Sequence, residues 1–245
     1  MTSPTHAPVG RPTATAPVLR AEGLSRAFGT GAGQVHALAD VSLEVEASEL
    51  VVVVGPSGSG KSTLLHLLGG LDAPSSGRVW LGGGPDGAVR ELTAMAEEEQ
   101  HAVRRSEIGY VFQAFGLVPV LSAAENVEVP LRLARTGVAE RTERVAAALA
   151  AVGLSEHALQ RPYELSGGQQ QRVGIARALV TEPRVLLADE PTGQLDSGTA
   201  AVVMDLVRDL VRSRGVAAVV TTHDPELMAR ADRVLVLRDG RLDAG

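Results

Sequence analysis

The sequence predicts an α/β protein with a mostly parallel β-sheet. Short runs rich in β-branched residues alternate with amphipathic helical segments, and the run ELVVVVG at residues 49–55 is apolar between its two ends. A continuous apolar run is typical of a strand buried on both faces, and strands that alternate with helices are typical of a parallel sheet. A glycine-rich stretch between this run and a helical segment supports the same fold class.

The composition predicts an aliphatic core in a chain of one large domain or two small ones. Of the 245 residues, 44% are hydrophobic but only 2% are aromatic, so Val, Leu and Ala must fill the interior. The formal net charge of -6 argues against a protein that coats DNA, which would present a basic face. The absence of cysteine excludes disulfides and thiolate metal sites, and it fits a reducing compartment.

The N-terminal residues 1–17 are expected to be a disordered extension, because Pro, Thr and Ala dominate them. They lack the apolar stretch of a signal peptide, and no apolar run approaches the roughly 18 residues of a membrane-spanning helix. We therefore expect residues 18–245 to form one domain in the cytoplasm. Any membrane that it serves would be approached from outside the bilayer.

The first elements combine a small sheet with the start of the core. Apolar stretches broken by Gly and polar residues predict two antiparallel strands ahead of the buried run. In the helix that follows, Leu64, Leu68 and Leu71 share one face. The expected elements up to residue 106 are strands at 16–28, 36–47, 49–55 and 77–83 and helices at 61–71 and 91–106.

The remaining elements continue the alternation after one interruption. Residues 115–162 are mostly helical in pattern, which predicts an inserted helical subdomain at about 114–175. Within it Val145, Leu149 and Val152 share a face, and Gly153 is placed to end the helix. The other expected elements are strands at 108–113, 184–190, 216–224 and 233–240, helices at 140–154 and 199–215, and a short helix from Asp224 with Pro225 at its first position.

The stretch GPSGSGKS at residues 55–62 matches the phosphate-loop pattern G-x-x-x-x-G-K-[ST] in full. It follows a buried strand and precedes a helix, where backbone N–H groups and the helix dipole stabilise a triphosphate. Lys61 is expected to reach the β- and γ-phosphates, Ser62 to bind Mg²⁺, and Thr63 to donate to the α-phosphate. The residues expected to contact ATP in this loop are Gly55, Pro56, Ser57, Gly58, Ser59, Gly60, Lys61, Ser62 and Thr63.

The run RVLLADE at residues 184–190 ends an apolar strand in two carboxylates. Asp189 fits the Mg²⁺ ligand that phosphate-loop enzymes carry at a strand end, and Glu190 is a candidate base for the water that attacks the γ-phosphate. Taken alone, the run would be an ordinary strand that enters an acidic turn. The phosphate loop upstream favours the catalytic interpretation.

A second candidate phosphate site lies at LSGGQ, residues 165–169. Ser166, Gly167, Gly168 and Gln169 open a helix, and a helix N-terminus with small residues can bind an anion. Because the chain already has a phosphate loop, we expect this second contact to act in trans. Two copies arranged head to tail would hold each ATP between the loop of one and the LSGGQ helix of the other.

These motifs, in this order, resemble the ATPase subunits of ABC transporters, over about residues 18–240. The resemblance implies an α/β P-loop NTPase (RecA-like) core with a small antiparallel β subdomain and an inserted α-helical subdomain. It implies that ATP hydrolysis drives a membrane permease. It also assigns LSGGQ as the family's signature.

Four further residues gain expected roles from the resemblance. Gln113 in YVFQ matches the Q-loop that meets Mg²⁺ and the membrane subunit, and Asp196 in GQLD matches the D-loop at the nucleotide interface of the dimer. His223 in TTHD matches the switch histidine that contacts the γ-phosphate. Phe28 stands where the family places an aromatic on adenine, although Tyr is commoner there and a lone Phe in a strand is usually a core residue.

The segment AFGLVPVLSAAENVEVPLRLAR at 114–135 resembles the lipoprotein-release and macrolide-export branch, the LolD- and MacB-like ATPases with the related cell-division ATPase FtsE. The resemblance implies a homodimer in the ATP-bound state, peripheral on the inner face of the membrane, beneath an FtsX- or MacB-like permease. Residues 117–121 are expected to dock that permease, and charges at Leu117 and Val120 to uncouple it.

Two other functions stay open at this point. One is an FtsE-like ATPase that transmits force to a membrane protein and moves no cargo. The other is a soluble ABC ATPase that acts on DNA or ribosomes; against it, no long coiled coil separates the motifs and each motif occurs once, so no nucleic-acid partner is expected.

Overall fold

The computed structural model describes residues 16–82, 88–224 and 228–243. The expected disordered extension at 1–17 therefore lies almost wholly outside the described residues. So does most of the short helix expected from Asp224. No helix among the described residues is long and apolar enough to cross a membrane.

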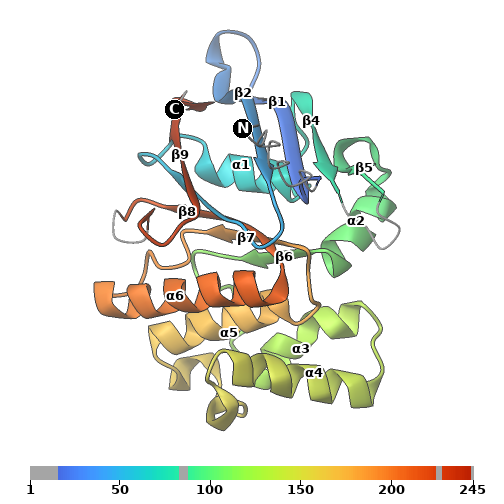
Figure 1. The fold of residues 1–245 in the computed structure, drawn as a ribbon, viewed down its shortest axis with the longest axis vertical. Coiled ribbons are helices and arrows are strands. Elements are labelled where there is room, and N and C mark those ends of the chain that lie inside the picture. Colours follow the sequence, from blue (N-terminus) through green and yellow to red (C-terminus); the bar gives the residue numbers. More distant parts are fainter. Residues whose placement is uncertain (1–15, 83–87, 225–227, 244–245) are drawn as a thin grey trace, which may run out of the picture.

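A mostly parallel sheet forms the centre of the molecule, as the sequence predicted (Figure 1). Its six strands lie in the order β10-β9-β3-β8-β7-β6. Strand β3 pairs in parallel with β8 and β9, β7 pairs in parallel with β6 and β8, and only β10 runs antiparallel to its neighbour. The strands are β3 (Leu50–Val54), β6 (Ile108–Val111), β7 (Val185–Asp189), β8 (Ala217–Thr222), β9 (Arg233–Arg238) and β10 (Arg241–Leu242).

The smaller sheet is antiparallel and has the order β2-β1-β4-β5. Its first two strands were predicted, and their register runs from Leu19 opposite Val45 to Phe28 opposite Val35. The two-residue strand β5 was not predicted. The strands are β1 (Leu19–Phe28), β2 (Val35–Val45), β4 (Ser76–Leu81) and β5 (Arg90–Glu91).

The helices divide between the two faces of the parallel sheet. Helix α1 lies between the two sheets, and α5 and α6 cover the opposite face of the parallel sheet, with α3 and α4 beyond them (Figure 1). The helices are α1 (Lys61–Leu68), α2 (Glu97–Ser106), α3 (Ala123–Leu133), α4 (Val138–Ala151), α5 (Gly167–Leu179) and α6 (Ser197–Arg214). Short 3-10 turns lie at Gly31–Gly33, Leu92–Ala94, Ser155–His157 and Pro162–Glu164.

Strand β3 separates two aliphatic cores, because its side chains alternate in direction. Val51 and Val53 pack with α1 and the antiparallel sheet. Leu50, Val52 and Val54 pack with the helices of the other face. All five are buried, which confirms the interpretation of the apolar run as a strand covered on both sides.

Several element boundaries differ from the expected ones, and two helix ends show why. The helix expected at 91–106 begins only at Glu97, because Ala96 is extended and its N–H is taken by the Glu99 carboxylate. The helix expected to reach residue 71 ends at Leu68, since Gly70 adopts a left-handed φ of 61°. The helical subdomain boundary expected at about 175 falls inside α5, which runs on to Leu179, and this boundary remains a prediction.

Candidate active site

The phosphate loop joins β3 to α1, and both of its neighbours are firmly packed. The four leucines of α1 are fully buried, and each such side chain contributes roughly 1.5–3 kcal/mol of burial free energy. A side chain at Gly55 would collide with the Leu237 carbonyl oxygen, and one at Gly60 would collide with the Ala37 carbonyl oxygen. Gly60 also has a φ of 102°, so the loop requires glycine at both positions.

The loop borders a cavity of about 300 Å³. Lys61 lies inside it with only 7% of its surface exposed, and its Nζ donates to the carbonyl oxygens of Gly55 at 2.9 Å and Pro56 at 3.1 Å. The only cation of the loop is therefore held where a phosphate chain would be cradled. The lining residues are Ala37, Ser57, Gly58, Gly60, Lys61, Ser62, Thr63, Gln113 and Glu190.

Three of the expected catalytic side chains contact the fourth, Glu190. Lys61 Nζ lies 3.5 Å from its Oε1, and His223 Nδ1 lies 3.4 Å from its Oε2. Gln113 Nε2 donates to Oε2 at 3.4 Å. These residues are far apart in the sequence, so the parallel sheet is what brings them to one edge of the cavity. The Glu190 backbone has a φ of 42°, a strained conformation of the kind that clusters at functional sites.

Thr221, which the sequence analysis missed, fixes both carboxylate residues. It is fully buried on β8 and lies opposite Asp189 in the parallel register. Its hydroxyl donates to Asp189 Oδ1 at 2.8 Å and accepts the backbone N–H of Glu190 at 2.9 Å. The available signal was a pair of hydroxyl residues at the end of an apolar strand, directly before His223.

The oxygen atoms near the loop suit a hard divalent cation. The hydroxyl of the exposed Ser62 lines the cavity, and the Asp189 carboxylate uses one oxygen on Thr221. Hydroxyl, carboxylate and phosphate oxygens are ligands that Mg²⁺ prefers. Across residues 16–82, 88–224 and 228–243, no three His, Asp or Glu side chains gather as a metal cluster by themselves.

The signature residues form the N-terminus of α5, away from the loop. Ser166 caps the helix, since its Oγ accepts the Gln169 N–H at 3.3 Å and Gln169 Oε1 accepts the Ser166 N–H at 2.8 Å. A side chain at Gly168 would collide with Thr199 at the start of α6. His157, which is not in any motif, places its Nε2 3.2 Å from Gln169 Nε2. Among the residues that line the loop cavity, none comes from 166–169.

Asp196 and Phe28 each have a local arrangement of their own. Asp196 caps α6, and the backbone hydrogen bond from Thr199 lowers the pKa of its carboxyl. Phe28 is 44% exposed at the end of β1, so it is not a core residue. The Arg26 guanidinium lies 4.7 Å from the centre of the Phe28 ring, and it also pairs with Asp72 at 2.8 Å.

Comparison with known proteins gives a consistent picture. A model of the ABC transporter family matches residues 38–193. The lipoprotein-releasing system ATP-binding protein LolD of Paramagnetospirillum magneticum is 46% identical over 224 residues, which cover 91% of this chain and 96% of LolD. The macrolide export ATP-binding/permease protein MacB of Burkholderia pseudomallei is 46% identical over 228 residues, which cover 93% of this chain but 34% of MacB.

Solved structures agree with the sequence relatives. A dimer of the ATP-binding cassette MJ0796 in a post-hydrolysis state, bound to ADP and Pi, matches with a TM-score of 0.81 and 38% identity, over 92% of this chain and 97% of that one. A second dimeric MJ0796 structure matches with the same TM-score and 39% identity. The chain therefore belongs to the ABC transporter family, as an ATP-hydrolysing subunit related to LolD and MacB.

Proposed function

We propose that this chain is the ATPase subunit of an export complex and works as a head-to-tail dimer. The observation that carries the proposal is the contact of Lys61, Gln113 and His223 with one carboxylate, Glu190, beside a phosphate loop. A carboxylate at that place can orient and deprotonate a water against the γ-phosphate. Most of the rate then comes from positioning and charge stabilisation.

The contacts support a role for each residue in this proposal. The backbone N–H groups of the loop after Pro56 bind the phosphates, and Lys61 neutralises charge on the β- and γ-phosphates. Glu190 activates the water, while His223 and Gln113 keep that carboxylate and the γ-phosphate aligned. Ser62 and Asp189, with Gln113, would hold Mg²⁺, which supplies further charge neutralisation on the phosphate oxygens.

The second half of each site comes from a second copy of the chain. Ser166 and Gly168 do not line their own loop cavity, yet the helix N-terminus that they form suits a γ-phosphate. The MJ0796 neighbours are dimers. Asp196, exposed at the start of α6, is placed to approach the nucleotide across such an interface.

The membrane partner is proposed to be a permease of the MacB or FtsX type. MacB is named as both an ATP-binding and a permease protein, and the match covers 34% of its length. The names of the relatives suggest export of lipoproteins or of macrolide-like compounds. The chain would then lie on the cytoplasmic face of the membrane.

The docking site for the permease is proposed to be an apolar groove of about 580 Å³. It lies next to the Gln113 loop, since Phe112 is part of its wall, and α3 contributes Val129, Pro130 and Leu133. A cytoplasmic helix of the permease, with its apolar face in the groove, fits this shape. Of the surface first expected, Val120 is 73% exposed, but Leu117 is partly buried against the core, so a charge there would also destabilise the fold.

The central experiment uses Glu190→Gln. The variant keeps the size of the side chain but loses the base, so we expect ATP binding with a turnover at least about 100-fold lower. With ATP and Mg²⁺ it should accumulate as a dimer in size-exclusion chromatography. Glu140→Gln, which neutralises an exposed carboxylate on α4, is the matched control. A Glu190→Gln variant that turns over ATP normally would refute the assignment of the base, and one that stays monomeric would refute the dimeric site.

A further inference from the structure

The chain makes a strained turn directly after Gln113. Phe115 has a φ of 56° and Gly116 a φ of 61°, and the Gly116 N–H donates to the Ala114 carbonyl oxygen at 2.5 Å. Such a three-residue turn with positive φ at its centre is rare, and a bulky residue in the left-handed region needs support from its surroundings. The turn begins at the residue that follows Gln113, so it constrains the backbone on the C-terminal side of Gln113.

The support comes from one arginine on the signature helix. Arg177 donates through Nη1 to the Gly116 carbonyl oxygen at 2.5 Å and through Nη2 to the Phe115 carbonyl oxygen at 3.1 Å. Its planar fork places two N–H donors in a fixed geometry that matches two neighbouring acceptors, whereas an ammonium group offers no such fixed fork. Gly174, one turn earlier on α5, lets the Phe115 carbonyl approach: a Cβ there would lie 3.3 Å from that oxygen.

The surroundings of Arg177 indicate that its contact with the turn carbonyls is part of the packed structure. Burial lowers the pKa of its guanidinium. The polar partners of its guanidinium in the described part of the chain are the two turn carbonyls. Arg177 also lines the apolar groove beside Phe112. It therefore touches both the groove and the turn that follows Gln113.

We propose that Arg177 is a positioning residue for ATP hydrolysis: it locks the turn at residues 114–116 and thereby sets Gln113 against Glu190. The inference rests on the proposed function of this site and adds a residue that contacts neither nucleotide nor Glu190. A segment docked in the groove meets the same guanidinium, so occupation of the groove reaches Gln113 through a continuous set of contacts.

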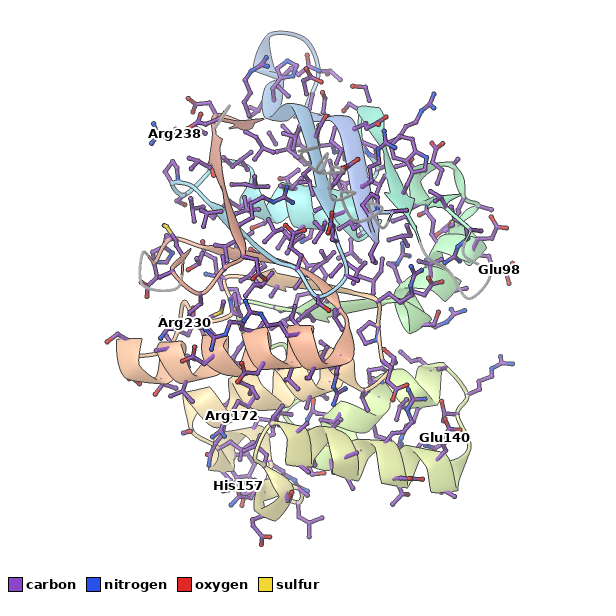
Figure 2. All side chains as sticks on the ribbon, viewed as in Figure 1. Glu98, Glu140, His157, Arg172, Arg230 and Arg238 are labelled. Carbon is purple, nitrogen blue, oxygen red and sulfur yellow. The ribbon has the colours of Figure 1, made fainter. Side chains whose placement is uncertain are left out.

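The test compares Arg177→Met with Arg172→Met in steady-state ATPase assays of the full chain. Arg172 lies on the same helix and donates to the Val152 carbonyl oxygen at 3.1 Å, on the side of α4 (Figure 2). We expect Arg177→Met to lower kcat roughly tenfold with ATP affinity changed less than about twofold, because positioning is lost and phosphate binding is not. Arg172→Met should retain kcat.

A double-mutant cycle with Gln113→Ala separates positioning from general destabilisation. Once Gln113 is truncated, Arg177→Met should cause no further loss of kcat. An equal loss in both backgrounds, or an unchanged kcat in folded Arg177→Met, would overturn the inference. If Arg177→Met is insoluble, Gly174→Ala displaces the Phe115 carbonyl without touching Arg177, and we expect a loss of about two- to fivefold judged by the same cycle. Absence of turnover in the unmodified chain would instead refute the proposed function itself.

Discussion

The phosphate loop and the signature helix are both helix N-termini built from Gly and Ser, but they satisfy their N–H groups differently. Helix α1 begins at a left-handed Gly60 and has no side-chain cap. Helix α5 begins with a complete capping box, in which Ser166 and Gln169 take each other's N–H groups. An uncapped N-terminus is ready to bind phosphate, whereas a capped one must exchange its internal hydrogen bonds for the ligand.

The phosphate loop and the signature helix also differ in the elements of the fold that surround them. The loop cavity contains residues from β2, the loop, the Q-loop and the end of β7, all within one chain. The signature helix contributes nothing to that cavity and instead packs against α3, α4 and α6. We infer that nucleotide binding is a property of one chain, and that turnover depends on a second.

The largest expected effect comes from the loop. Lys61 is the only lysine in the sequence, so its ammonium is the one cation of this kind available. Lys61→Ala should weaken ATP binding by about 100-fold or more in isothermal titration, because charge-assisted bonds to the phosphates are lost. Arg78→Ala, which removes an exposed cation from β4, is the control for net charge. Normal affinity in a folded Lys61→Ala chain would show that the loop is not the phosphate site.

Thr221→Val tests whether the buried Thr221 hydroxyl holds Asp189 and Glu190 in place for catalysis. The change removes the hydroxyl that joins Asp189 to the Glu190 N–H, and it leaves that N–H without its partner. We expect kcat to fall about tenfold and the free energy of unfolding to drop by about 1–3 kcal/mol. Thr221→Ser keeps the hydroxyl and should restore kcat. A Val variant with normal kcat would mean that the carboxylates do not depend on this bond.

Thr221 also shows what the sequence could and could not predict. Residues 55–62 define their own geometry, since glycines, a preceding strand and a following helix are all local in the chain. The pairing of Thr221 with Asp189 depends on which strands are neighbours, and no local pattern reports that. The family resemblance supplied Gln113 and His223, and the structure then brought both onto Glu190.

Boundaries and short elements were harder to predict for a similar reason. The polar helix expected from residue 91 starts late because Leu92 is buried and Gln100 donates to two carbonyl oxygens before the helix. Strands β5 and β10 have two residues each, so they carry no periodicity to detect. Arg177 donates to Gly116 and Phe115, which lie 61 and 62 positions earlier in the chain, so only the packed structure reveals this contact.

A smaller effect is expected at Phe28, the residue expected to stack on adenine. Phe28 is exposed and supported by Arg26, so it can stack on a base. Phe28→Ala should raise the KM for ATP about fivefold or more, since base stacking on an aromatic is worth roughly 1–3 kcal/mol. Phe28→Tyr keeps the ring and should behave like the unmodified chain. Because stacking depends on the ring face, GTP should also be hydrolysed; an unchanged KM in the Ala variant would remove Phe28 from the site.

The smallest effect on the isolated ATPase is expected in the groove. Leu133 lines it and is 63% exposed, so Leu133→Glu should leave basal ATPase activity within about twofold, as exposed substitutions usually cost little stability. The same charge placed where an apolar permease helix docks should prevent co-purification with the permease and abolish stimulation of ATPase activity by it.

Two further variants locate the docking surface. Val120→Glu tests the neighbouring segment, and Val138→Glu, on an exposed position at the start of α4, is the matched control. Loss of co-purification with Leu133→Glu alone would place the permease in the groove, whereas loss with Val120→Glu alone would place it on residues 117–121. Retention in both variants would exclude the two surfaces, and since neither residue lines the phosphate-loop cavity, it would leave the assignment of the ATPase site unchanged.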